Sequence, residues 1–288
     1  MIQGIIDSAG WLGDFRLPVG DWVEAVVLWI QLNMTAVLDG FAAVIRFLTG
    51  SFEKGLLALP AWLLALGIVA LGWWRVGWKF AVFAALALSV IVGMALWRET
   101  VQTLALVLAA SAVALAVGIP AGIAMARSKL IETVARPVLD FMQTMPSFVY
   151  LIPAAIFFGL GAVPGAIATV VFSMPPAVRL TNLGIRQVDI EQIEAGLAFG
   201  CTRRQLLTKV QLPLALPSIM AGVNQTIMLA LSMVVIASMI GAGGLGTTVL
   251  TGIQRLNVGL GFEGGLGVVI LAILLDRITQ SFAPGQRD

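Results

Sequence analysis

The sequence has no histidine and only one cysteine, Cys201, among its 288 residues. Histidine is the commonest general base and the commonest metal ligand, so its absence argues against a hydrolase or a zinc enzyme. A single cysteine forms no intrachain disulfide and no Cys-rich metal cage, and we expect Cys201 only to fill a small site beside Gly200. No cleavable signal peptide is expected, because the first residues are acidic and the first long apolar run begins near Leu56.

Charged residues are also scarce. They make up 11% of the chain, whereas 59% is hydrophobic and the mean hydropathy is +1.00. Soluble globular domains carry roughly a quarter charged residues, so this chain has too little polar surface to cover itself in water. The net charge of +2 is too small and too scattered to indicate nucleic acid as a partner. The composition predicts a protein in a lipid bilayer, and the helix-length apolar stretches predict that it is an all-α membrane protein.

Seven apolar stretches are long enough to cross a bilayer, wholly or with help from their flanks, since about 20 residues span the hydrocarbon core as a helix. Tryptophans at the ends of the first two stretches suit the headgroup layer. The stretches are Leu56–Trp74, Trp78–Trp97, Thr100–Met125, Val138–Leu160, Val163–Val178, Leu212–Ile240 and Gly264–Ile278.

Basic residues predict the orientation, because they are retained on the cytoplasmic side. With seven spans and the N-terminus outside, one face holds most of them and the other only Arg16, Arg46, Lys54, Arg98 and Arg255. This predicts an external N-terminus and a cytoplasmic C-terminus. The basic residues on the predicted cytoplasmic face are Arg75, Lys79, Arg127, Lys129, Arg136, Arg179, Arg186, Arg203, Arg204, Lys209, Arg277 and Arg287.

The segment ahead of the first stretch is amphipathic. From Trp22 to Leu48 apolar residues recur at helical spacing, interrupted by charged and polar ones. This pattern predicts a helix lying along the outer membrane interface. The alternative is a first spanning helix, which would place the basic loops outside.

The longest loop of the predicted cytoplasmic face, Arg179 to Gln211, carries the clearest local signals. Asp189 with Gln192 predicts a capping box that opens a short helix through Ile190–Phe199. Gly200 suits the left-handed residue that ends a helix, and Thr202 with Gln205 predicts a second box and a second short helix ending before Pro213. Two short helices joined at a glycine would form a rigid projection that transmits force, but an ordinary solvated hairpin would show the same pattern.

Part of this loop resembles the EAA motif of ATP-binding-cassette (ABC) importer permeases, E-A-A-x3-G-x9-I-x-L-P. The sequence departs from the motif at Gly196, for the second alanine, and at Val210, for isoleucine. In that family the element is the coupling helix that docks into a cleft of the ATPase subunit. The resemblance implies ATPase coupling by Glu194, Ala195, Gly196, Gly200, Arg203, Arg204, Val210, Leu212 and Pro213.

The resemblance extends over roughly residues 97–280. The strings Arg136 to Leu151, Ala221 to Ile240 and Gly243 to Gly246 are similar to permeases of the ProU-type systems, which import glycine betaine, proline betaine, choline and trimethylamine N-oxide. The family implies a type I, MetI-like fold in the bacterial inner membrane. It also implies a second copy of the permease, two ATPase subunits that bind ATP and magnesium, and an external substrate-binding protein, with no cofactor on the permease itself.

The predicted organisation follows from the stretches and the resemblance together. An external segment with the interfacial helix covers residues 1–55, and two accessory spans cover 56–98. The MetI-like core of five helices covers 99–281, with the coupling helices near 189–211, and 282–288 form a cytoplasmic tail.

Several residues inside the predicted spans admit two interpretations. Asn224, Gln225, Thr226 and Ser232 could form hydrogen bonds between packed helices, or could line a neutral path for a zwitterion or cation. Tyr150, the only tyrosine, could offer a cation–π face to a trimethylammonium group or could simply pack.

Proline and glycine residues give two further signals. Pro146, beside Met145, and Pro153 predict kinks in the fourth span, which could mark a gate or only packing. Gly118 and Gly122 have the G-x-x-x-G spacing of a close helix contact.

The spans hold almost no ionisable residue at mid-depth. Asp140 and Asp276 lie toward one end of their spans and Glu263 toward the other. Ion-coupled transporters usually keep a buried acid or histidine for the ion, so this distribution favours drive by an ATPase. The rival hypotheses are an ion-coupled secondary transporter or channel, and a membrane scaffold that transports nothing.

Overall fold

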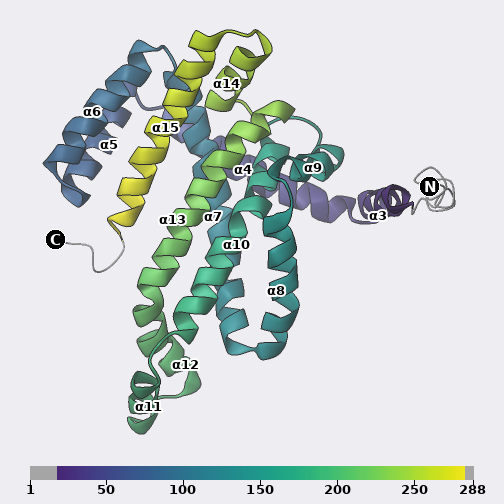
Figure 1. The fold of residues 1–288 in the computed structure, drawn as a ribbon, viewed down its shortest axis with the longest axis vertical. Coiled ribbons are helices and arrows are strands. Elements are labelled where there is room, and N and C mark those ends of the chain that lie inside the picture. Colours follow the sequence, from purple (N-terminus) through teal and green to yellow (C-terminus); the bar gives the residue numbers. More distant parts are fainter. Residues whose placement is uncertain (1–17, 283–288) are drawn as a thin grey trace, which may run out of the picture. The chain divides into compact units, whose positions relative to one another are not determined.

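The computed structural model describes residues 18–282, and every regular element within that range is helical (Figure 1). The described chain divides between Phe41 and Ala42 into two units. The predictions for residues 1–17 and 283–288, including those for Arg16 and Arg287, lie outside the described residues.

The predicted interfacial helix Trp22–Leu48 is wrong as a single element, because it divides at Met34 into α3 (Val19–Asn33) and α4 (Thr35–Leu57). The Asn33 side chain donates to the Trp29 carbonyl and the Thr35 hydroxyl to the Gln31 carbonyl. Such local bonds compete with the backbone ladder of a helix and account for the break. α4 also has the length and composition of a membrane span.

Five described helical runs could cross a membrane by length and composition: α4, α7 (Trp97–Arg127), α10 (Ala162–Arg186), the run Arg203–Ile240 and α15 (Val258–Gln280). A bent pair of helices would make a sixth. Four of these five runs, α7, α10, Arg203–Ile240 and α15, and the bent pair coincide with predicted stretches. The first two predicted spans are the shorter helices α5 (Ala61–Arg75) and α6 (Trp78–Gly93), of 15 and 16 residues.

The second unit is built around α10. This helix is buried between α7 and α13 (Leu212–Ala237), and the predicted end of the stretch at Val178, just after Pro175 and Pro176, is wrong, since the helix continues to Arg186. Both prolines are buried inside the helix, where the neighbouring helices hold the backbone that local sequence alone would break. The loop that follows begins at Gln187 rather than at Arg179.

Glycines bring the backbones of these three helices together. A Cβ added at Gly122 of α7 would lie 2.6 Å from the Val178 carbonyl oxygen of α10, which confirms the close contact predicted from the G-x-x-x-G spacing. A Cβ added at Gly184 of α10 would lie 2.7 Å from the Ser218 Cβ of α13. Real Cβ atoms do not approach this closely, so only glycine fits at either position.

The predicted fourth span Val138–Leu160 is also wrong as a single helix. α8 (Lys129–Thr144) ends before Pro146, and the 3-10 turn Ser147–Tyr150 with α9 (Leu151–Phe158) leaves it at 108°. Pro146 disfavours helical backbone at Met145, whose ψ of 134° is extended. Pro153 lies in the first turn of α9, where a missing N–H is tolerated, and makes no kink.

Ion pairs connect α8 to α10. The Glu132 carboxylate is 7% exposed and lies 2.5 Å from an Arg136 nitrogen and 2.7 Å from an Arg186 nitrogen. A second pair, between Asp140 and Arg179, is more exposed. Because only the Glu132 carboxylate is withdrawn from water, it depends on its two arginine partners, whereas the exposed Asp140–Arg179 pair contributes little.

The remaining helices lie beside this centre in Figure 1. α5 and α6 form a hairpin that packs on α15 through Leu88 and Ile91 of α6 and Ile270 and Leu274 of α15. α15 begins at Val258, earlier than the predicted Gly264, because the Asn257 side chain accepts the Leu260 N–H and caps it. α14 (Leu245–Gln254) packs on α15.

We expect Gly122→Ala to lower the free energy of unfolding by about 1–3 kcal/mol, the usual cost of overpacking. Thermal unfolding of the purified chain in detergent measures this. Gly67→Ala in α5 is the control, because a Cβ there meets no heavy atom within 4 Å. Equal effects of the two substitutions would contradict the glycine contact between α7 and α10.

A second prediction compares the two acids of α8. Glu132→Ala leaves two arginines without their shared partner and should lower the unfolding temperature clearly, whereas Asp140→Ala removes an exposed pair and should change it little. The same thermal unfolding assay serves. A larger loss for Asp140→Ala would show that burial does not govern these pairs.

Candidate functional site

The loop between α10 and α13 folds into a projection made of α11 (Ile190–Ala198), α12 (Arg203–Leu206) and the π-helical turn η2 (Leu207–Gln211). In Figure 1 these elements lie at one end of the second unit, beyond the ends of α10 and α13. We call them the α11–α12 projection. Most of the residues implied in ATPase coupling lie here.

The end of α11 follows the prediction. Gly200 has a φ of +79°, its N–H donates to the Leu197 carbonyl, and the N–H of Cys201 donates to the Gly196 carbonyl. This pair of bonds closes a helix through a left-handed residue, which glycine adopts without strain. The start of α11 differs from the prediction: Asp189 is the N-cap residue, but its side chain accepts no capping bond.

The second capping box is confirmed. The Gln205 N–H donates to the Thr202 hydroxyl oxygen at 3.3 Å, and the Thr202 N–H donates to the Gln205 side chain at 2.9 Å. The short helix that it opens, α12, ends at Leu206, before Pro213, as predicted. The structure adds that the chain stays helical from Arg203 to Ile240, because the wider turn Leu207–Gln211 joins α12 to α13, and Pro213 lies in the first turn of α13.

Gly196 forms the inner surface of the projection. It is buried, and a Cβ at this position would lie 2.8 Å from a Leu206 methyl group and 3.6 Å from Val210. The glycine costs α11 about 1 kcal/mol of helix propensity but allows close packing on the next turns. α11 is thereby held against the helical run that becomes α13.

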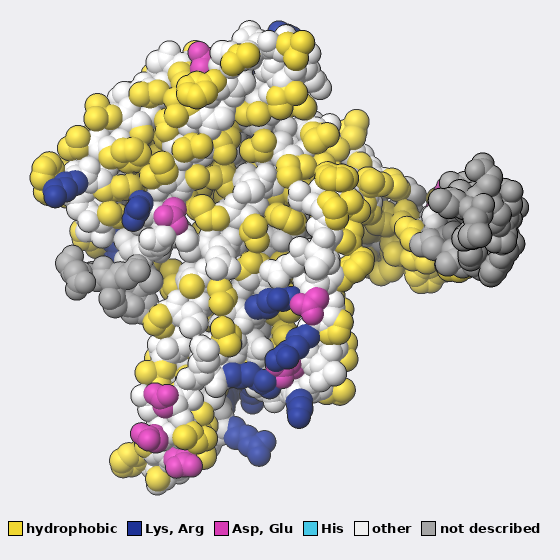
Figure 2. Space-filling view, in the orientation of Figure 1, with side chains coloured by type: hydrophobic (Ala, Val, Ile, Leu, Met, Phe, Trp, Pro, Cys, Tyr) yellow, Lys and Arg dark blue, Asp and Glu magenta, His cyan; other side chains and the backbone are white. Residues whose placement is uncertain are grey.

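The outer surface carries charge and exposed apolar side chains. Glu194 and Ala195 are exposed on α11, as are Gly200, Arg203 and Arg204, while Val210 and Leu212 are half-buried and Pro213 is exposed. Figure 2 shows acidic and hydrophobic side chains gathered where α11 lies. Three apolar side chains not predicted as part of this surface are also exposed: Ile190, Leu197 and Phe199, the last 89% exposed. The sequence signal that could have indicated them is the presence of large apolar residues in an otherwise polar loop.

The polar residues of α13 that were proposed for a translocation path differ in burial and in partners. The Asn224 side chain donates to the Asp276 carboxylate at 2.8 Å and accepts from the Thr279 hydroxyl at 2.7 Å, which joins α13 to α15. Thr226 is fully buried and Gln225 is exposed. The exposed hydroxyl of Ser232 donates to the Met228 carbonyl of its own helix. The contacts of Asn224 therefore match the first of the two interpretations, in which this side chain forms hydrogen bonds between packed helices.

Tyr150 is likewise engaged within the fold. Its hydroxyl donates to the Met142 carbonyl at 2.5 Å, and its ring meets Phe172 edge-on at a centroid distance of 6.1 Å. These contacts hold the turn after α8 against α10. Met145 packs against the main core and Pro146 is exposed.

Within residues 18–282, no group of three or more histidine, cysteine or acidic side chains is arranged to hold a metal ion. Cys201, expected to fill a small site beside Gly200, is a free thiol and half-buried.

Comparison with known proteins adds independent information. The family model described as binding-protein-dependent transport system inner membrane component matches residues 118–288. A glycine betaine/carnitine transport permease protein of Listeria monocytogenes is 49% identical over 92% of this chain and 95% of its own length. A glycine betaine transport system permease protein of Bacillus subtilis is 46% identical over 92% of this chain and 94% of its own.

A trimethylamine N-oxide transport system permease protein of Ruegeria pomeroyi is 34% identical over 92% of this chain but only 42% of its own length. Among solved structures, an inward-facing MetNI methionine ABC transporter chain matches with a TM-score of 0.56 at 24% identity, over 62% of this chain and 91% of that chain. This likeness establishes the fold alone, which is the predicted MetI-like fold. The chain therefore belongs to the family of inner membrane components of binding-protein-dependent transport systems.

Proposed function

We propose that this chain is the permease subunit of an ATP-driven importer for a quaternary or methylated amine. The names of its relatives, which transport glycine betaine, carnitine or trimethylamine N-oxide, support this substrate class. The observation that carries the proposal is the α11–α12 projection, whose exposed surface is attached at both ends to buried helices.

The projection is the docking element for an ATPase subunit in this proposal. Exposed apolar side chains with acids beside them form the kind of surface that a protein cleft covers. Glu194 supplies a charged hydrogen-bond acceptor, and Phe199 supplies apolar area at the end of α11. ATP and magnesium bind to the ATPase, so the permease itself carries no cofactor.

The remaining partners follow from the same proposal. A second copy of the permease completes the pathway, and an external binding protein delivers the amine. The α11–α12 projection then faces the cytoplasm, with the basic residues of α8 and α10 on the same side, as the retention of positive charge requires. The predicted external N-terminus and cytoplasmic C-terminus belong to this orientation.

The mechanism is conformational, and no bond is made or broken in this chain. ATP brings the two ATPase subunits together and moves each projection. Because Gly196 packs on Leu206, and Gly184 of α10 packs on Ser218 of α13, the projection, α10 and α13 move as one body. That movement opens and closes the pathway between the two copies.

We expect Glu194→Ala to reduce docking of the ATPase by roughly tenfold or more, since a hydrogen bond to a charged group contributes about 1.5–3 kcal/mol. Gly200→Ala should weaken coupling by straining a residue with positive φ, at a cost of about 1 kcal/mol. The measurement is stimulation of ATPase activity by amine-loaded binding protein, together with amine uptake, in proteoliposomes containing all subunits.

Asp140→Asn on α8 is the matched control, because it removes an exposed carboxylate away from the α11–α12 projection. It should leave stimulation and uptake near the original values. Normal stimulation and uptake in both Glu194→Ala and Gly200→Ala would refute the assignment of the projection as the coupling element.

A further inference from the structure

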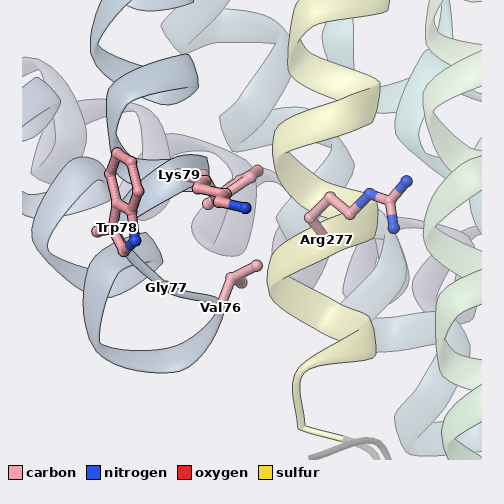
Figure 3. Close-up of a pocket in the computed structure, with 6 residues that line it drawn as sticks. Val76, Gly77, Trp78, Lys79 and Arg277 are labelled. Carbon is pink, nitrogen blue, oxygen red and sulfur yellow. The ribbon is translucent and has the colours of Figure 1, made fainter. Parts of the chain in front are cut away.

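A cleft of about 380 Å³ opens between the turn that joins α5 to α6 and the last turns of α15. It is lined by Val76, Gly77, Trp78, Lys79, Phe80 and Arg277 (Figure 3). The two charged side chains of this lining are cations, and no carboxylate contributes to it. Asp276, which precedes Arg277, is bonded instead to Asn224 and Gln280.

Neither cation of the cleft has a partner among the described residues. Lys79 and Arg277 are exposed, and no ion pair or hydrogen bond involves their side chains within residues 18–282. Figure 3 shows Lys79 reaching from α6 toward α15, while the Arg277 side chain crosses α15 and extends away from Lys79. Two cations without partners, one from each helix, are therefore among the residues that line the cleft.

The backbone adds donors to the same lining. No side chain caps the start of α6. Counting from that start, Ala81 is the first residue whose backbone N–H has an acceptor within the helix, the Gly77 carbonyl. The amides of residues 78–80 are thus left for an outside acceptor at the positive end of the helix dipole. Backbone amides and nearby cations together are the donor set that binds a phosphate group.

The surroundings indicate where that phosphate comes from. Trp73, Trp74 and Trp78 are all exposed at this end of the hairpin, and amphipathic indole rings favour the headgroup layer of a bilayer. The α6 face beyond them is exposed and apolar, with Val82 and Leu86 available to acyl chains. A cleft with cations, amides and an apolar flank beside these tryptophans suits a lipid headgroup rather than a soluble anion.

We propose that this cleft binds the phosphate headgroup of an anionic phospholipid. The lipid bridges the α5–α6 hairpin and α15, in addition to the apolar contact of Leu88 and Ile91 with Leu274. Arg75 strengthens the same junction from the protein side, since its guanidinium donates to the Ser281 carbonyl at 2.8 Å and lies over the Phe282 ring.

Native mass spectrometry of the delipidated full-length chain tests the proposal. Phosphatidylglycerol and phosphatidylcholine with identical acyl chains are offered in equal amounts, and the ratio of the bound lipids is measured. The original chain should prefer phosphatidylglycerol, and K79Q/R277Q should reduce that preference by roughly tenfold or more, since each basic residue near an anionic surface contributes about fivefold.

Two further variants separate charge from fold. K79R/R277K keeps both charges and should keep the preference. R98Q/R255Q removes two exposed cations from α7 and the end of α14, away from the cleft, and should keep it too. The proposal is overturned if the original chain binds both lipids equally, if K79Q/R277Q retains the preference, or if R98Q/R255Q loses it to the same extent.

Discussion

The close approach of α10 to α7 and α13 is the constraint on which the rest of the structure depends. Inside a bilayer the hydrophobic effect does not drive helices together, because lipid tails are as apolar as the side chains. Helices there associate by van der Waals contact, and close contact between backbones requires small residues. Gly122 and Gly184 allow this close contact, since a methyl group at either position would collide with the facing helix. The burial of α10 between two backbones keeps it helical through Pro175 and Pro176.

This packing gives the α11–α12 projection its mechanical value. α11 is fixed at its start to the end of α10, and along its inner surface to the turns that continue into α13. Gly200 and the box of Thr202 with Gln205 fix the turn between them. A partner that grips the exposed side of α11 therefore moves two buried helices and not a loose loop.

Local sequence correctly predicted two features of the α11–α12 projection. The helix end at Gly200 and the box at Thr202 each need a few residues and no tertiary contact, and both are present. The MetI-like fold and the family were predicted from the EAA motif and the longer strings that carry the resemblance, and both are confirmed.

The predictions failed where tertiary packing outweighs local preference. Pro146 ends a helix while Pro153, Pro175 and Pro176 do not, and only the neighbouring helices distinguish them. The pairing of Asn224 with Asp276 spans 52 residues and has no sequence signal. The exposed apolar residues of α11 were visible in the sequence, but their exposure was not.

The most direct measurement of the central claim is cross-linking in the assembled transporter. Phe199→Cys is introduced at the end of α11 in a chain whose single native cysteine is replaced, Cys201→Ser. Ile253→Cys, at another exposed apolar position, on α14, serves for comparison. The account predicts cross-links from position 199 to the ATPase subunit and none from position 253. No cross-link from position 199, or equal cross-linking from both, would contradict it.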